Sequence, residues 1–146
     1  MSSEDKNIID IYRRHAGSWA KLRGQHLAEK AWLDKFLELL PDEPSVLDMG
    51  CGFGEPIGRY LLEKGSAVTG IDASPELIQI ARERVAEATW IVSDMRVLRL
   101  DTKFDGILAW NSTFHLTPND QRQMFPVFRQ HAAKGAAQHV TNQCID

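Results

Sequence analysis

The first residues along the chain that are suited to chemistry form a glycine-rich run, which follows a short apolar segment. This run, Asp48–Gly54, has glycines at positions 50, 52 and 54. Glycine lets a backbone turn sharply and approach a ligand where a Cβ atom would collide. Because a helix is predicted directly after the run, the loop is placed to hold a ligand at a helix N-terminus. The alternative is a tight turn that binds nothing.

The charge of this loop bears on which nucleotide it could bind. A dinucleotide-binding loop follows the pattern G-x-G-x-x-G, in which a pyrophosphate rests on the helix N-terminus. Here the last position of that pattern is Glu55. We expect its carboxylate to repel a pyrophosphate, and Asp48 adds negative charge beside the loop. The sequence therefore favours a cationic or zwitterionic ligand, and an NAD-dependent oxidoreductase remains as an alternative.

Two more carboxylates follow the next two apolar segments. Asp72 is placed to accept hydrogen bonds from both hydroxyls of a ribose. Its alternative role is to cap the following helix, but Ser74 already holds that position. Asp94 is placed to accept from an exocyclic amine, next to Met95 as an apolar surface for a purine ring. A solvated turn residue is the alternative for Asp94. Together these residues predict an adenosine site.

A fourth polar run, Ala109–Leu116, follows another apolar segment and carries Trp110, Asn111 and His115. His115 is the histidine placed to remove a proton from a hydroxyl or amine substrate. The alternative is a histidine that only packs or forms a hydrogen bond. Cys51 has no metal-ligand spacing around it, so we expect it to offer its backbone alone and predict no metal site.

Alternating strands and helices must position these runs. Strands are predicted at 45–48, 67–71, 89–92 and 104–109, and a short polar fifth strand at 136–141. Helices are predicted at 32–40, at about 56–64, from Pro75, and from Pro118 to about Lys134, where Gly135 stops the helix. This order predicts a Rossmann-like, mostly parallel sheet with helices on both faces. Ligands of such sheets bind at the carboxyl ends of the strands, which is where the polar runs fall.

Length and composition limit the possible functions. The chain has 146 residues, with 17 Lys and Arg against 20 Asp and Glu, a formal charge of −3. This length is typical of one domain. Without a basic excess, nucleic acid is not an expected partner, and without an apolar run of about 18 residues, a membrane span is not expected. Two cysteines and a start with no apolar signal segment predict a reduced, cytoplasmic protein.

Four motifs, taken together, resemble those of the class I S-adenosylmethionine-dependent methyltransferases. In chain order they are Asp-Met-Gly-Cys-Gly-Phe-Gly (48–54), Val-Thr-Gly-Ile-Asp-Ala-Ser (68–74), Ser-Asp-Met-Arg (93–96) and Phe-Asp-Gly-Ile-Leu-Ala (104–109). The resemblance covers residues 46 to about 116. Residues 12–19 with Arg23 also resemble the cap helices of the small-molecule branch, which close over the cofactor. The family resemblance thus implies one domain, 1–146, with a helical cap at 1–44 and a Rossmann-like core at 45–146.

The resemblance implies roles for individual residues toward S-adenosylmethionine and its product, S-adenosylhomocysteine. The cofactor-binding set is Tyr12, Trp19, Arg23, Asp48, Gly50, Cys51, Gly52, Asp72, Ala73, Asp94, Met95, Trp110 and Asn111. Residues 50–52 would line the methionine portion through their backbone, and Asp48 would lie near its ammonium group. Ala73 and Met95 would flank the adenine.

The resemblance also implies roles for residues of the fourth polar run and of the helical cap. Trp110 and Asn111 would face the methionine end of the cofactor. Tyr12, Trp19 and Arg23 would complete the lid, with Arg23 pairing with the cofactor carboxylate. For Tyr12 and Trp19, a place in the hydrophobic core is the alternative.

The implied reaction transfers a methyl group from the sulfonium to an oxygen, nitrogen or carbon atom of a small molecule, and His115 is the candidate base. The family has seven strands in the order 3-2-1-4-5-7-6, whereas this chain has room for five. We therefore expect an open sheet edge, a partly uncovered Phe125, Val127 and Phe128 face, and a homodimer through the C-terminal region. A catalytically silent cofactor-binding or interaction module is the alternative function.

Overall fold

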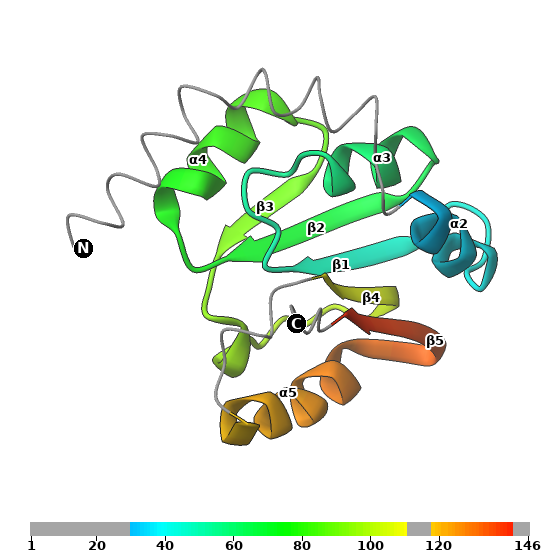
Figure 1. Cartoon of the computed structure of the whole chain (residues 1–146), viewed down its shortest axis with the longest axis vertical. Helices are drawn as coiled ribbons and strands as arrows, with labels where there is room; N and C mark the ends of the chain where they lie inside the picture. Colours follow the sequence, from blue (N-terminus) through cyan, green and yellow to red (C-terminus); the bar gives the residue numbers. More distant parts are fainter. Residues whose placement is uncertain (1–29, 111–117, 142–146) are drawn as a thin grey trace, which may run out of the picture.

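The computed structural model describes residues 30–110 and 118–141 (Figure 1). The strands are β1 (Ser45–Met49), β2 (Ala67–Asp72), β3 (Thr89–Val92), β4 (Phe104–Trp110) and β5 (Ala132–Thr141). The helices are α2 (Lys30–Glu38), α3 (Ile57–Glu63), α4 (Pro75–Arg84) and α5 (Pro118–His131), with a short 3-10 helix, η1 (Met95–Val97). The first four strands fall within one residue of their predicted bounds, because each is a short apolar run between turn residues.

The five strands form one parallel sheet in the order β3-β2-β1-β4-β5. This order places β1 at the centre. It matches the first five strands of the order 3-2-1-4-5-7-6 that the resemblance implied. At the start of β1, the carboxylate of Asp105 accepts from the backbone N–H of Ser45 at 3.0 Å. The Ser45 hydroxyl in turn accepts from the backbone N–H of Asp105 at 3.1 Å. This exchange helps fix the alignment of β1 with β4.

Helices cover both faces of the sheet, which makes three layers (Figure 1). On one face α2, α3 and α4 pack on a cluster that includes Val46, Val68, Trp90 and Leu108. On the other face α5 and η1 pack on a cluster that includes Leu47, Met49, Ile71 and Ile107. Successive residues of a strand point to opposite faces, so a strand buried on both sides is apolar throughout. None of the helices in 30–110 and 118–141 is long and apolar enough to cross a membrane.

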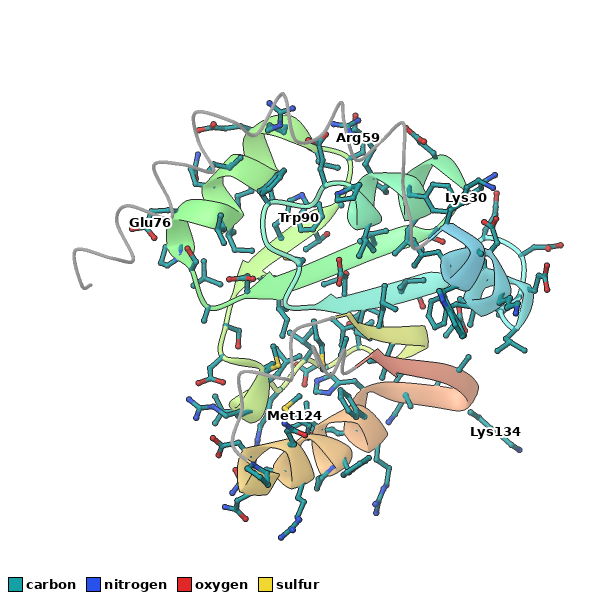
Figure 2. All side chains as sticks on the ribbon, viewed as in Figure 1. Lys30, Arg59, Glu76, Trp90, Met124 and Lys134 are labelled. Atoms are coloured by element: carbon teal, nitrogen blue, oxygen red, sulfur yellow. The ribbon has the colours of Figure 1, made fainter. Side chains whose placement is uncertain are left out.

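Trp90 fills the space between the sheet and the helices α3 and α4 (Figure 2). Its indole N–H donates to the carbonyl oxygen of Val85 at 2.7 Å, which fixes the ring. Three glycines leave room for this ring: a Cβ atom would come within 2.8 Å of it at Gly54 and 2.9 Å at Gly58, and would collide with it at Gly70. Trp90 therefore sets how closely the glycine-rich loop and α3 approach the sheet.

The C-terminal part of α5 differs from the prediction. The helix ends at His131 rather than near Lys134, and β5 begins at Ala132, which pairs with Phe104. The regular ladder then runs from Ala137 to Thr141, after a register shift that includes Gly135 at φ 80°. Gly135 thus marks a bend within β5 instead of a helix stop, because pairing with β4 draws the chain into the sheet.

His131 closes α5 with both ring nitrogens bonded. Nδ1 lies 2.7 Å from the carbonyl oxygen of Val127, and Nε2 accepts from the backbone N–H of Leu100 at 2.9 Å. The imidazole is fully buried. A ring that donates through Nδ1 and accepts through Nε2 is neutral, so this histidine ties α5 to the segment before β4 without burying a charge.

The expected apolar face of α5 is only partly exposed. Val127 and Phe128 are buried against the sheet, together with Met124 (Figure 2). Phe125 is 61% exposed and meets Phe128 edge-on, with ring centroids 6.4 Å apart. The prediction of a partly uncovered face is therefore confirmed: the helix turns Val127 and Phe128 toward β4 and η1, and Phe125 is the exposed part.

We predict that Gly70→Ala lowers the free energy of unfolding by about 1–3 kcal/mol, the usual cost of overpacking a core. The added methyl group would collide with the Trp90 ring and come within 2.9 Å of Sγ of Cys51. Urea unfolding of Gly70→Ala in the wild-type and Trp90→Leu backgrounds measures the effect. Because the ring is absent from the second background, the loss should be smaller there. Equal losses in both backgrounds would show that the ring does not exclude the methyl group.

Candidate functional site

The predicted polar residues converge at the carboxyl ends of three neighbouring strands. The glycine-rich loop follows β1, Asp72 ends β2, and Ser93 and Asp94 follow β3. These strands run parallel, so their carboxyl ends lie at one edge of the sheet (Figure 1). The backbone N–H of Ser93 donates to the carbonyl oxygen of Asp72 at 3.0 Å, which joins the second and third segments.

Three consecutive backbone N–H groups of the glycine-rich loop, those of residues 50–52, are bonded within the protein. Those of Gly50 and Cys51 both donate to the carbonyl oxygen of Ile71, at 2.8 and 2.9 Å. That of Gly52 donates to Oδ2 of Asp72 at 3.0 Å. Gly52 has φ 59°, the left-handed region that favours glycine. A pyrophosphate needs free N–H donors, and these three groups are not available to it.

Asp72 links the loop, β2 and α4. Its Oδ2 accepts from Gly52, and its Oδ1 accepts from the backbone N–H of Ser74 at 2.9 Å. Ser74 is the N-cap of α4, as predicted, with its hydroxyl accepting from the N–H of Leu77 at 3.3 Å. Each carboxylate oxygen has two acceptor positions, so both oxygens of Asp72 retain one for a ligand. Its bond to Ser74 and a ligand role are therefore compatible.

Asp48 is a second carboxylate behind the loop, and it is 3% exposed. Burial raises its pKa from 3.8 to about 7, and the charge of Asp72 adds to the rise. Near neutral pH Asp48 is thus partly ionised in a setting that gives its charge little water. A nearby cation would stabilise the ionised form of Asp48.

Glu55 does not act as expected. The side chain of Glu55 is 4% exposed and lies between two arginines, with Arg59 Nε 2.6 Å from Oε1 and Arg84 Nε 3.1 Å from Oε2. Arg59 also donates to the carbonyl oxygen of Arg84 at 2.6 Å. The expected repulsion of a pyrophosphate was wrong, because this carboxylate is neutralised by its partners. Through its ion pair with Arg84, Glu55 links the end of the loop to the C-terminal end of α4.

The residues expected around an adenine ring differ in exposure. Ala73 is exposed and Met95 is half-buried against the core below η1. Asp94 begins η1, where Oδ1 accepts from the backbone N–H of Arg96 at 2.9 Å. The hydrogen bonds from Arg96 hold the pKa of Asp94 below its usual value, so the carboxylate stays ionised.

Cys51 points into the protein. Its Sγ lies 3.6 Å from the carbonyl oxygen of Gly52, and burial raises the pKa of its thiol. The thiolate is the reactive form of cysteine, so this side chain is chemically inert. The geometry fits the expectation that Cys51 serves through its backbone.

Several predicted residues lie outside the described part of the chain. These are Tyr12, Trp19, Arg23, Asn111 and His115. Trp110 is the last residue of β4, but its side chain also lies outside what is described.

Sequence reasoning missed three contributors to the site: Trp90 under the loop, the arginine pair around Glu55, and Arg96 beside Asp94. Arg59 follows Glu55 by four residues in the sequence, a spacing at which opposite charges often pair, and this could have indicated the pair although Glu55 precedes α3. Arg84 is distant in sequence, and Trp90 looks like any buried strand residue. Only the tertiary structure brings these two to the loop.

We predict that Asp48 makes stability depend on pH. Between pH 3.8 and about 7 the folded state holds a proton that the unfolded state has lost. The free energy of unfolding therefore falls as the pH rises through this range, by up to about 1.4 kcal/mol per pH unit. Urea unfolding at stepped pH should show this decline in wild type and in the exposed control Asp101→Asn. Asp48→Asn should lack this decline, so the free energy of unfolding of wild type minus that of Asp48→Asn should fall with pH, whereas wild type minus Asp101→Asn should stay flat. A wild-type slope in Asp48→Asn would refute the assignment.

Comparisons with known proteins identify the family of this chain. The methyltransferase-domain family matches residues 46–135. The chain is 34% identical over 126 residues to the protein named "Putative methyltransferase YqeM" of Bacillus subtilis, a match that covers 82% of this chain and 50% of that protein. The chain spans half or less of the length of the first curated relatives it matches.

Two solved structures extend the comparison. The first is a TehB-like SAM-dependent methyltransferase from Corynebacterium glutamicum, with TM-score 0.63 and 26% identity, covering 83% of this chain and 71% of that one. The second is SAM-bound CalS10, an amino pentose methyltransferase from Micromonospora echinaspora, with TM-score 0.65 and 25% identity, covering 78% and 50%. With the family match extending over more than half of its residues, the chain belongs to the class I S-adenosylmethionine-dependent methyltransferases.

Proposed function

We propose that this chain binds S-adenosylmethionine at the carboxyl edge of β1, β2 and β3 and transfers its methyl group to a small molecule. The observation that carries the proposal is the position of Asp72. Gly52 and Ser74 hold its carboxylate from two sides, and each of its oxygens keeps one free acceptor position. Two adjacent acceptors match the two hydroxyls of a ribose.

The charge at the loop supports a cationic methionine portion. Asp72 lies close enough to Asp48 for its charge to raise the pKa of Asp48 further, and the N–H groups of residues 50–52 are already bonded. The cofactor carries an ammonium group and a sulfonium, which these carboxylates and the carbonyl oxygens of residues 50–52 would stabilise. Cys51 takes part through its backbone. In this proposal Arg23 pairs with the carboxylate of the cofactor, and Tyr12, Trp19, Trp110 and Asn111 enclose it.

The adenine portion would lie beyond the ribose, next to η1. The half-buried Met95 and the exposed Ala73 offer apolar contact for the two faces of the ring. Asp94 stays ionised and thus can only accept hydrogen bonds, which suits the exocyclic amine of adenine.

The reaction requires little acid or base chemistry from the protein. A lone pair of the acceptor attacks the methyl carbon, and the electrons of the breaking carbon–sulfur bond move to sulfur, which leaves neutral S-adenosylhomocysteine. Aligning the two reactants and excluding water can contribute up to roughly 7–11 kcal/mol. The acceptor must also lose its proton when it is a hydroxyl or an amine, and His115 is the residue proposed to take it.

The acceptor is proposed to be a small molecule. The amino pentose enzyme among the solved relatives acts on such a substrate, and it shares this fold. The second candidate is a cofactor-binding module without turnover. A radiolabelled-methyl assay on a panel of amines and hydroxyl compounds separates the two.

We propose further that residues 1–44 form a helical cap over one core domain and that the protein is cytoplasmic.

We also propose that the protein forms a homodimer through its C-terminal region. Within the described ranges, β5 pairs only with β4, and Phe125 on the adjoining helix is exposed. An open strand edge beside an apolar side chain favours pairing with a second copy. Sedimentation of the wild type and Phe125→Lys would report the mass; a monomeric wild type would contradict the dimer.

Calorimetric titration tests the cofactor directly. We expect S-adenosylhomocysteine to bind saturably and NAD to produce no heat, because the N–H groups of residues 50–52 are already bonded and leave a pyrophosphate fewer donors. Saturable NAD binding with no response to S-adenosylhomocysteine would overturn the proposed function.

We predict that Asp72→Ala weakens S-adenosylhomocysteine binding by roughly 10- to 150-fold. Two ribose hydroxyls would lose a charged acceptor, and a hydrogen bond to a charged group contributes about 1.5–3 kcal/mol. Asp72→Asn should have a smaller effect, and the exposed control Asp101→Ala none. Circular dichroism checks that each variant is folded. A folded Asp72→Ala that binds as tightly as wild type would remove Asp72 from the site.

A further inference from the structure

The glycine-rich loop has two ends, and each end is bonded to a different element. At the first end, the backbone N–H groups of residues 50–52 donate to Ile71 and Asp72 of β2. At the far end, the carboxylate of Glu55 accepts from Nε of Arg84 at 3.1 Å, and Arg84 is the last residue of α4. The loop is therefore held to β2 on one side and to α4 on the other.

Between these ends, Phe53 packs on the same helix. Phe53 is buried and forms a small apolar cluster with Leu77 and Ile80 of α4. Ile80 and Arg84 are four residues apart, so they lie on one face of α4. This face thus meets the loop twice, through an apolar contact at Phe53 and through an ion pair at Glu55.

Glu55 is the buried member of its ion pairs. Its side chain is 4% exposed, whereas those of Arg59 and Arg84 are 40% and 35% exposed. Nε of Arg59 lies 2.6 Å from Oε1 of Glu55, and Nη2 of Arg59 donates to the carbonyl oxygen of Arg84. A buried carboxylate cannot exchange such partners for water without a large cost in free energy. Glu55 is therefore held where the two arginines place it.

We infer that Glu55 is a positioning residue, whose ion pairs with Arg59 and Arg84 hold the glycine-rich loop in the conformation that receives the methionine portion of S-adenosylmethionine. This role rests on the proposed function, because it concerns the methionine end of the same site. Asp72, just before α4, would bind the ribose, and Glu55 ties the loop to the other end of that helix. The helix α4 is then a common support for the two ends of the bound cofactor.

Two ligands that differ at the methionine end test this role. S-adenosylhomocysteine carries the amino acid group, whereas methylthioadenosine keeps the adenosine and the sulfur but has a methyl group in its place. Both ligands offer their ribose to Asp72. Only S-adenosylhomocysteine can contact the loop through an amino acid group, so wild type should bind it more tightly.

In Glu55→Gln the affinity for S-adenosylhomocysteine should fall by roughly 5- to 30-fold, the loss expected when binding must order one more loop residue. The affinity for methylthioadenosine should change little. Arg84→Met removes the partner on α4 at a mostly polar surface position and should show a selective loss in the same direction. The controls Glu87→Gln and Arg99→Met each remove one exposed charge and should leave both affinities unchanged. Circular dichroism checks that each variant is folded.

A double-mutant cycle shows whether Glu55 acts through Arg84. In that case Glu55→Gln should weaken S-adenosylhomocysteine binding less in the Arg84→Met background than in wild type, because the contact with α4 is already lost. Equal losses in the two backgrounds would overturn the inference.

The ratio of the two dissociation constants separates positioning of the loop from a general loss of structure. Equal weakening of both ligands in Glu55→Gln would overturn the inference, because the ion pairs would then support the whole site, and unchanged binding of both would overturn it as well. The same selective loss in Glu87→Gln or Arg99→Met would overturn it by making net charge the cause. A wild type that binds both ligands equally would overturn it and leave binding of the adenosine portion standing. A wild type that binds neither would refute the proposed function itself.

Discussion

The site depends on one carboxylate that joins three segments of backbone. Asp72 ends β2, accepts from Gly52 in the loop after β1, and accepts from Ser74 at the start of α4. Without it, the loop and the helix would each have an N–H donor without this partner at the edge where a ligand must bind. Because a carboxylate has four acceptor positions, these two internal bonds do not exhaust it. The same group therefore organises the edge and remains able to bind a ligand.

The loop held by Asp72 is shaped from below by packing. Trp90 comes from β3, yet its ring occupies the space that three glycines leave open in the loop, in α3 and in β2. Protein interiors are close-packed, so a change on either side of this contact must move the other. The glycines in and around the loop thus have two functions: Gly52 permits a left-handed backbone, whereas Gly58 in α3 and Gly70 in β2 leave room for an aromatic ring.

The acidic residues of the site show that charge depends on surroundings more than on residue type. Glu55 is neutralised by two arginines and acts as a clamp. Asp94 is held ionised by Arg96. Among residues 30–110 and 118–141, no arginine pairs with Asp48, and burial raises its pKa to about 7. The site thus gathers its unneutralised negative charge beside the loop, where a cation would be stabilised, and this distribution separates the site from one built for a pyrophosphate.

The sequence by itself determined the alternation of strands and helices, the N-cap at Ser74, the edge where polar residues gather and the family resemblance. Such features depend on local periodicity and on motifs of consecutive residues. The partners of each charge, the ring beneath the loop and the end of α5 were decided by tertiary structure. Glu55 meets Arg84 only because α4 packs beside α3, and His131 ends its helix bonded to the distant Leu100. A sequence lists charges and rings in order, but the distances between them, on which their pKa values and contacts depend, exist only in the folded chain.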